Sequence, residues 1–280
     1  MVQWYPGHME RARKMVLKKI AQVDLVLELL DARIPASSSN PELEKIISNR
    51  DKKRIIILNK KDLADPQLTA CWKSYYRKKA PVFAINSVKK EGISPLMKYI
   101  QNKMKEENSL VDLKAMVVGI TNTGKSTLIN ALSRNKKVKT GGSPGVTRGK
   151  QWLAISGGLH LLDTPGILWP DFSEEVGYKL AITGAVSDSN FDIQLAAYKL
   201  LKYLLSLKPE ALKSQYNIED TSGEPYDIMA EIGRKRGCLQ SGGRIDRSRT
   251  SRLLLKDYRS GELGAVTLEK PDNEQTGDKK

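Results

Sequence analysis

The chain has 280 residues, of which 40% are hydrophobic and 28% are charged, so it is long enough for one large globular domain or two smaller ones. Lys and Arg outnumber Asp and Glu by 47 to 32, and this net charge of +15 favours a polyanionic partner such as nucleic acid, although solubility alone would also account for it. Neither a membrane helix nor a secretory signal is evident, and the two cysteines lack metal-ligand neighbours, so we expect a cytoplasmic protein with no membrane partner.

The first predicted helix begins at Pro6, because proline is favoured in the first helical turn. Its apolar residues recur at helical spacing and mark one buried face: Met9, Ala12, Val16 and Ile20. Five of the remaining positions are basic, namely Arg11, Arg13, Lys14, Lys18 and Lys19. They form either a solvated surface or a surface that faces RNA.

Strands and helices then alternate along the chain. Three apolar runs are predicted to be buried strands, namely 23–30, 54–58 and 82–85. A helix is expected after each of them, beginning at a pair of residues that favours a helix start: Asn40-Pro41, Asp65-Pro66 and Ser94-Pro95. This alternation predicts a parallel sheet with helices on both faces.

Residues Gly119 to Ser126 match the phosphate-binding pattern G-x-x-x-x-G-K-[ST]. An apolar strand, 115–118, precedes the pattern and an apolar helical run, 127–132, follows it, which is the context that the pattern requires. We expect backbone N–H groups to bind phosphate oxygens, Lys125 to reach the β- and γ-phosphates, and the Ser126 hydroxyl to bind Mg²⁺. The predicted nucleotide-binding residues here are Asn122, Thr123, Gly124, Lys125, Ser126 and Thr127. The alternative is a glycine-rich turn that binds nothing.

A second pattern, N-K-x-D, directly follows the strand predicted at 54–58, as Asn59-Lys60-Lys61-Asp62. The Asp62 carboxylate can accept hydrogen bonds from N1–H and N2–H of guanine, which adenine cannot offer, so the pattern predicts GTP and GDP as ligands. We expect Asn59 to brace the loop and the Lys60 stem to lie on the base. Asn86 and Ser87 follow the next predicted strand, 82–85. Either their backbone N–H groups lie near guanine O6, or the two residues form an ordinary turn.

The γ-phosphate end of the site is predicted from the segment after the phosphate loop. A β-hairpin, 152–155 and 159–162, leads into Asp163-Thr164-Pro165-Gly166, which matches D-x-x-G. We expect Asp163 to hold Mg²⁺ through water and the Gly166 N–H to meet the γ-phosphate. In the preceding loop, Thr147 is the candidate switch threonine that binds Mg²⁺ in the triphosphate state, and Thr140 is the alternative.

The strand patterns end near residue 175, so we place one domain at 1–174 and an all-helical domain at 175–280. Five helices are predicted in the second domain: 176–186, 192–207, 210–216, 226–236 and 244–258. The stretch 234–259 holds nine basic residues and two acidic ones, which favours an RNA-binding or ribosome-binding role. The polar tail, 269–280, is expected to be disordered.

Together these elements predict an α/β fold with a mostly parallel sheet wrapped by helices, followed by a helical domain. The motifs resemble those of the translation-factor class of P-loop GTPases, but the guanine motifs precede the phosphate loop, so the sheet is predicted to be circularly permuted. This order resembles the ribosome biogenesis GTPase A family over nearly the whole chain. Further matching segments are Trp4-Tyr5-Pro6-Gly7-His8-Met9, Asp31-Ala32-Arg33 and Lys235-Arg236-Gly237-Cys238.

The resemblance implies a bacterial GTPase that binds the immature large ribosomal subunit and its rRNA, and hydrolyses GTP late in assembly. GTP or GDP and Mg²⁺ would be its cofactors, and Asn122 would help to hold K⁺ beside the phosphates. We expect no DNA partner and a monomeric state. The D-x-x-G segment, which is expected to contact the γ-phosphate, lies near the end of the first domain. Loss of the γ-phosphate could therefore be relayed through a short connection into the helical domain.

Hydrolysis is expected to be slow without a partner, because Ile167 occupies the place of the water-orienting glutamine of Ras-like enzymes. The resemblance suggests that His8 supplies this function once the N-terminus folds over the site; otherwise His8 has a structural role beside Trp4. The candidate catalytic residues are thus His8, Lys125 and Thr147.

Two other functions remain open from the sequence. The chain could be an RNA-binding structural or chaperone protein whose nucleotide site only stabilises the fold. The basic stretch 234–259 could instead bind DNA. The predicted set of phosphate and metal ligands favours the GTPase over the structural or chaperone protein, and competition between ribosomal RNA and duplex DNA would decide the DNA alternative.

Overall fold

The computed structural model describes residues 6–106, 112–133, 152–155, 157–169 and 172–271. They form two compact units, which we call the sheet unit and the helical unit. The helical unit spans Phe172–Leu268, and the sheet unit comprises the described residues before it together with 269–271. None of the helices in these ranges combines the length and the apolar character that a membrane span needs.

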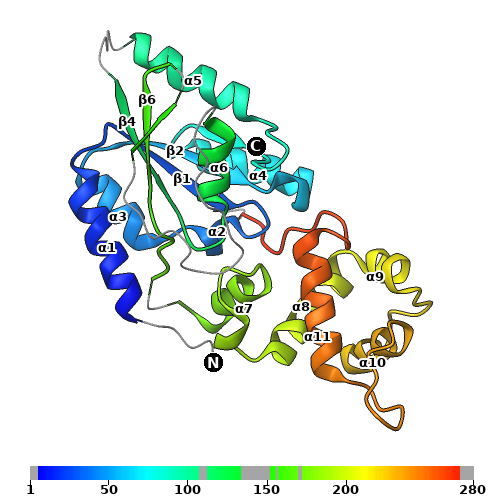
Figure 1. Ribbon diagram of the computed structural model, residues 1–280. Helices are drawn as coiled ribbons and strands as arrows, with labels where there is room; N and C mark the ends of the chain where they lie inside the picture. Colours follow the sequence, from blue (N-terminus) through cyan, green and yellow to red (C-terminus); the bar gives the residue numbers. More distant parts are fainter. Residues whose placement is uncertain (1–5, 107–111, 134–151, 156, 170–171, 272–280) are drawn as a thin grey trace, which may run out of the picture. The chain divides into compact units, whose positions relative to one another are not determined.

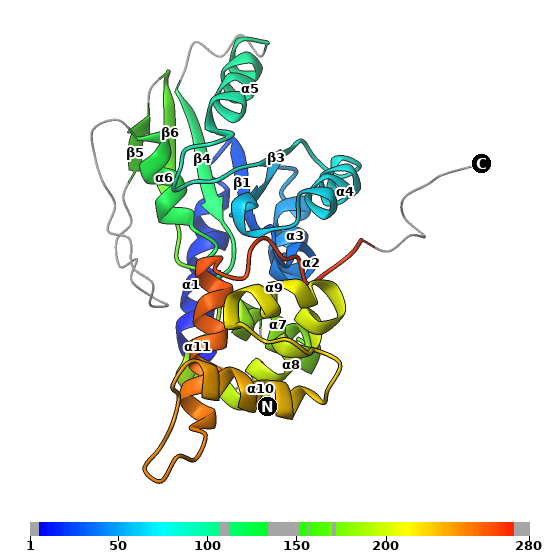
Figure 2. The same cartoon turned by 90° about the vertical axis from the view of Figure 1, so that its right-hand side faces the viewer.

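The sheet unit is built on six strands in the order β3-β2-β1-β4-β6-β5 (Figure 1; β3 and β5 are labelled in Figure 2). The strands are β1 (Leu25–Asp31), β2 (Lys53–Asn59), β3 (Val82–Ala84), β4 (Leu113–Val118), β5 (Trp152–Ile155) and β6 (Leu159–Asp163). Neighbouring strands are parallel except β5 and β6, which form the predicted hairpin. The mostly parallel, circularly permuted α/β sheet is confirmed.

Helices cover both faces of this sheet, because the side chains of each buried strand alternate between the two faces. Leu25, Leu27 and Leu29 pack in one core with α5 (Ile93–Glu106) and α6 (Lys125–Leu132). Val26 and Leu30 point to the other face, which is covered by α1 (Pro6–Ile20), α3 (Pro41–Asn49) and α4 (Pro66–Arg77). Figure 2 shows β3 and α4 at the right of the sheet and β5 at the left, at the two ends of the strand order.

The helix starts follow from local side-chain chemistry. The Asn40 side chain accepts hydrogen bonds from the backbone N–H groups of Glu42 and Leu43, and the Asp65 side chain accepts one from Leu68, as expected for N-caps before a first-turn proline. In α1 the apolar face is buried at Ala12, Val16 and Ile20, whereas most of its basic residues are exposed. The predicted amphipathic helix is therefore present.

The helical unit contains α7 (Glu174–Ile182), α8 (Ile193–Leu207), α9 (Pro209–Tyr216), α10 (Pro225–Lys235) and α11 (Arg247–Ser260). These match the five predicted helices to within a few residues. Its core is lined by residues of α8, α10 and α11, including Leu200, Leu204, Ile232, Leu254 and Tyr258. Within the core, the Tyr216 hydroxyl donates to the buried Asp257 carboxylate over 2.9 Å.

Two features of the sheet unit differ from the sequence-based expectations. The short helix α2 (Pro35–Ser38) was not predicted, because a single turn has no period to detect. We also expected the disordered tail to begin at residue 269, but Glu269 is buried. Its carboxylate accepts hydrogen bonds from the N–H groups of Ala36 and Ser37 and from the Ser37 hydroxyl, which explains its order. The expectation for 272–280 lies outside the described residues.

Candidate nucleotide-binding site

The predicted phosphate loop joins β4 to α6, and two of its glycines combine a positive φ with a close contact that leaves no room for a Cβ. A Cβ at Gly119, where φ is +150°, would lie 2.4 Å from the Leu29 carbonyl oxygen. A Cβ at Gly124, where φ is +98°, would lie 2.4 Å from Nδ2 of Asn59. Gly124 also caps α6, so the loop backbone ends at the positive end of a helix, where anions are favoured.

Lys125 begins α6 and its ammonium group turns back onto the loop. Its Nζ donates to the Ile120 carbonyl over 2.7 Å, and the side chain is almost fully buried. Burial lowers the pKa of Lys125 to about 8; Asp163 opposes this shift and the charge of Lys60 adds to it. A bound polyphosphate would supply the negative charge that this buried cation lacks.

The two predicted metal ligands that fall on described residues lie together. The Ser126 hydroxyl donates to Asp163 Oδ2 over 3.0 Å, and Asp163 Oδ1 is buried without a hydrogen-bond partner among the described residues. Burial raises the pKa of the Asp163 carboxyl. A hydroxyl and a carboxylate with an unused oxygen fit Mg²⁺, which prefers oxygen ligands and keeps several of its waters.

The D-x-x-G segment packs directly on the phosphate loop. A Cβ at Gly166 would lie 2.6 Å from both Cα and N of Thr121, so only glycine permits this approach. The Ile167 N–H donates to the Gly119 carbonyl over 3.2 Å, and the Ile167 side chain is 2% exposed in the core. A buried apolar side chain at this position cannot orient water.

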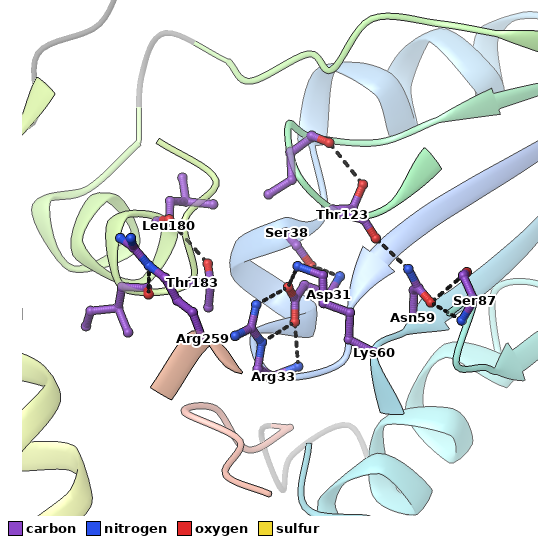
Figure 3. Close-up of polar contacts among 12 residues, drawn as sticks. Asp31, Arg33, Ser38, Asn59, Lys60, Ser87, Thr123, Leu180, Thr183 and Arg259 are labelled. Atoms are coloured by element: carbon purple, nitrogen blue, oxygen red, sulfur yellow. Dashed lines mark hydrogen bonds and ion pairs between the residues drawn. The ribbon is translucent and has the colours of Figure 1, made fainter. Parts of the chain in front are cut away.

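Asn59 connects the N-K-x-D loop to both neighbouring loops (Figure 3). Its Nδ2 donates to the Thr123 carbonyl of the phosphate loop over 2.6 Å. Its Oδ1 accepts hydrogen bonds from the backbone N–H and the hydroxyl of Ser87, at 3.1 and 2.8 Å. One buried amide thereby joins three of the predicted nucleotide-binding loops at one edge of the sheet.

The remaining N-K-x-D side chains point in different directions. The Lys60 ammonium lies 2.9 Å from Asp31 Oδ2, and the Lys61 ammonium lies 3.1 Å from Glu91 Oε2. Asp62 lies in a single 3₁₀ turn, Lys61–Leu63, and is exposed. Its carboxylate is therefore accessible to a base.

The Asn86 side chain shapes the loop after β3 by accepting hydrogen bonds from the loop backbone. Its Oδ1 accepts hydrogen bonds from the N–H groups of Val88 and Lys89 over 2.9 and 3.0 Å. Its Nδ2 is buried and has no hydrogen-bond partner among the described residues. The side chain thus leaves one buried donor unused beside Asn59 and Ser87.

Some predicted site residues cannot be placed against this geometry. Thr147 and its alternative Thr140 lie outside the described residues. His8 falls in α1, but its side chain is not among those described.

Two further predicted residues lie in or just after the phosphate loop. Asn122 adopts a left-handed backbone, with φ of 57°, and both Asn122 and Thr127 are partly exposed.

Asp31 belongs to none of the predicted nucleotide-binding motifs, and the structure places it against Lys60. Its carboxylate also receives the Arg33 guanidinium, at 2.9 Å from Nε and 2.7 Å from Nη2. Burial alone would raise the pKa of Asp31, but the charges of Arg33 and Lys60 hold it well below its usual range. The signal available in the sequence was an acid and a base, Asp31 and Arg33, placed at the end of a mostly apolar strand.

Comparisons with known proteins agree with this architecture. A family profile described as "50S ribosome-binding GTPase" matches residues 114–230. Ribosome biogenesis GTPase A of Bacillus licheniformis is 43% identical over 98% of this chain and 99% of its own length. The crystal structure of GNP-bound YlqF from T. maritima superposes with a TM-score of 0.66 at 28% identity, covering 94% of this chain and 99% of that one. A GDP-bound YlqF structure gives a TM-score of 0.65.

Proposed function

This chain belongs to the ribosome biogenesis GTPase A family, and we propose that it hydrolyses GTP while bound to the immature large ribosomal subunit, where it promotes a late assembly step. Contact with the particle stimulates hydrolysis, and hydrolysis drives release of the factor. The observation that carries the proposal is that Asn59 joins the N-K-x-D loop, the phosphate loop and the loop after β3. GNP and GDP in the solved relatives support the same ligands here.

In this proposal, guanine and the phosphates bind to separate groups of residues at one edge of the sheet. The exposed Asp62 carboxylate accepts two hydrogen bonds from guanine, which separates GTP from ATP by orders of magnitude, since charge-assisted bonds contribute roughly 1.5–3 kcal/mol each. The phosphates bind the backbone N–H groups at the start of α6 and the Lys125 ammonium.

The residues that would hold Mg²⁺ are Ser126 through its hydroxyl, Asp163 through water, and Thr147. When bound, Mg²⁺ would neutralise charge that develops on the transferred phosphoryl group. The unused Oδ1 of Asp163 supports this assignment. Asn122 is proposed to help bind K⁺, and turnover that is unchanged between K⁺ and Na⁺ buffers would remove that role.

The isolated protein is expected to hydrolyse GTP slowly, because Ile167 is buried in the core and cannot orient the attacking water. The ribosomal particle is proposed to complete the site by bringing the N-terminus over it, so that His8 takes over this function. His8→Ala should then abolish the stimulation by large subunits and leave GTP affinity unchanged. Equal stimulated rates would dismiss His8.

The surface proposed to bind rRNA lies on α10, α11 and the segment between them. The two acidic residues of 234–259 serve the fold, because Asp246 caps α11 and Asp257 is buried against Tyr216. Eight of the nine basic residues in this stretch are exposed: Arg234, Lys235, Arg236, Arg244, Arg247, Arg249, Arg252 and Lys256. Such a surface binds phosphate backbones with strong salt dependence.

The deciding experiment measures GTP turnover at fixed salt and Mg²⁺, with and without immature large subunits. We expect a slow basal rate that rises strongly with the particles, and no equivalent rise with duplex DNA. Arg252→Ala combined with Lys256→Ala should weaken the stimulation and leave the basal rate unchanged. A basal rate as high as the stimulated one, or no stimulation by the particles, would contradict the proposal.

A further inference from the structure

Asp31 and the predicted guanine-reading loop meet at the ends of two neighbouring strands. Asp31 ends β1 and is paired in register with Asn59, which ends β2. Its Oδ2 lies 2.9 Å from the ammonium of Lys60, the residue after Asn59. The Asp31 side chain is only 4% exposed, whereas that of Lys60 is 23% exposed. The ion pair therefore links a buried strand end to a side chain that a ligand can reach.

The Asp31 carboxylate is held rigidly by groups other than Lys60. The Arg33 guanidinium binds both oxygens, and the Arg33 N–H donates to Oδ1 over 3.1 Å. The backbone N–H of Asp31 donates to the Ser38 hydroxyl over 3.0 Å, which ties the strand end to α2 (Figure 3). A two-pronged contact with arginine fixes the plane of a carboxylate as well as its distance. Asp31 thus presents Oδ2 to Lys60 in one orientation.

Lys60 needs such a restraint. Its backbone is left-handed, with φ of 60° and ψ of 37°, a conformation that is unfavourable for a non-glycine residue. Its flexible stem also loses rotamer entropy when it is fixed. Because Arg33 already neutralises Asp31, the three charges sum to +1, and Lys60 remains an effective cation.

We infer that Asp31 is a positioning residue for nucleotide binding: it holds the Lys60 side chain in place before the ligand arrives, so that the Lys60 stem lies against the guanine base. This inference rests on the proposed function, in which Asn59 to Asp62 bind guanine. The base is common to GTP and GDP, so both affinities depend on Asp31 equally. Phosphoryl transfer does not involve it.

The test is a double-mutant cycle on the full chain, with GDP binding measured by calorimetry at pH 7. Asp31→Asn keeps the shape of the side chain and removes its charge; it should weaken GDP and GTP binding by about the same factor, roughly 10-fold or more. In the Lys60→Ala background the same substitution should have almost no further effect. With large subunits present, Asp31→Asn should raise KM and leave kcat unchanged.

A matched control breaks another carboxylate–arginine contact, in the helical unit. Asp188 binds the Arg259 guanidinium at 2.8 and 3.2 Å, so Asp188→Asn should leave GDP affinity at the wild-type value. Thermal unfolding of each variant verifies that the measured protein is folded. If Asp31→Asn does not fold, Lys60→Met, which keeps the stem without its charge, should show the same loss of affinity.

Wild-type affinity of Asp31→Asn or of Lys60→Met would overturn the inference. An equal loss of GDP affinity from Asp31→Asn in the wild-type and Lys60→Ala backgrounds would also overturn it, because Asp31 would then not act through Lys60. Both results leave the proposed function standing, provided that the wild-type protein binds GDP in preference to ADP. Failure of that preference would overturn the proposed function and the inference with it.

Discussion

The side-chain amide of Asn59 donates a hydrogen bond to the Thr123 carbonyl over 2.6 Å, across 64 residues of chain. The same side chain accepts two hydrogen bonds from Ser87 and is 2% exposed. Gly124 has no room for a Cβ because this amide lies against it. The spacing between the predicted base-binding and phosphate-binding loops therefore depends on one residue of the N-K-x-D pattern, before any contact with a nucleotide.

Asn59→Asp should separate these loops while leaving the acceptor for Ser87 in place. The substitution turns a donor into a carboxylate oxygen that faces the Thr123 carbonyl, so two acceptors oppose each other. We expect GDP affinity to fall by roughly 10- to 100-fold, which corresponds to the loss of a buried hydrogen bond plus the resulting repulsion. Calorimetry measures this loss. Asn102→Ala, at an exposed site in α5, is the control, and equal affinities for both variants would argue against the role of Asn59.

Gly166→Ala should damage the site through the close approach of the D-x-x-G segment to the phosphate loop. The added methyl group would lie 2.6 Å from backbone atoms of Thr121, which cannot rotate away, so one segment must shift. Because Gly166 is predicted to meet the γ-phosphate, we expect affinity for a non-hydrolysable GTP analogue to fall more than affinity for GDP. The ratio of the two affinities, measured by competition, reports this change.

The matched control for that substitution is Gly223→Ala. Gly223 has no atom within 4 Å of an added Cβ and no positive φ, so both affinities should remain at the wild-type values. If Gly166→Ala keeps the wild-type ratio of affinities, the contact with Thr121 is not what places the segment at the γ-phosphate.

Local patterns in the sequence were sufficient for most of the fold. The Asn40 and Asp65 caps, the buried strand β1 and the apolar face of α1 depend on neighbours a few residues away, so they were predicted from local patterns. Ends of helices shifted by a few residues, as for α11, which begins after the Asp246 cap rather than at Arg244.

The parts that could not be predicted depend on contacts between distant residues. Asn59 was expected to brace its loop, but its partner Thr123 became evident only when the strands were paired in space. The contact of Asp31 with Lys60 required the register of β1 against β2. Glu269 was assigned to a polar tail, because the composition of 269–280 gives no sign of a contact with a helix start. Glu269 contacts that helix start 232 residues earlier in the chain.

Glu269→Ala should destabilise the sheet unit, since Glu269 supplies the N-cap that α2 lacks locally. Ile34 provides no side-chain cap, and the N–H groups of Ala36 and Ser37 both donate to the Glu269 carboxylate. Loss of a cap and of buried hydrogen bonds predicts about 1–3 kcal/mol less stability, or a Tm lower by several degrees. Thermal unfolding without nucleotide measures the change. Glu262→Ala, at an exposed position, should leave Tm unchanged, and equal Tm values for the two variants would refute the capping role.

Nucleotide affinity should fall as the pH rises above 8, because of Lys125. Burial lowers the pKa of this side chain to about 8 in the free protein, with Asp163 and Lys60 as the charges that act on it. Bound phosphates favour the ammonium form and raise its pKa, so binding above pH 8 takes up a proton. Between pH 7 and pH 9 we expect GDP affinity to drop by about tenfold, since each pH unit above the free-protein pKa costs up to one factor of ten.

Calorimetry in buffers of different ionisation enthalpy should detect this proton uptake near pH 8.5 as a buffer-dependent binding enthalpy. Lys125→Arg is the control, because the guanidinium stays charged throughout this range and should remove the uptake even where affinity is reduced. Titration of the nucleotide itself would affect both proteins alike, so only their difference reports Lys125. If wild type and Lys125→Arg show the same proton uptake, the buried lysine is already fully charged before the phosphates bind.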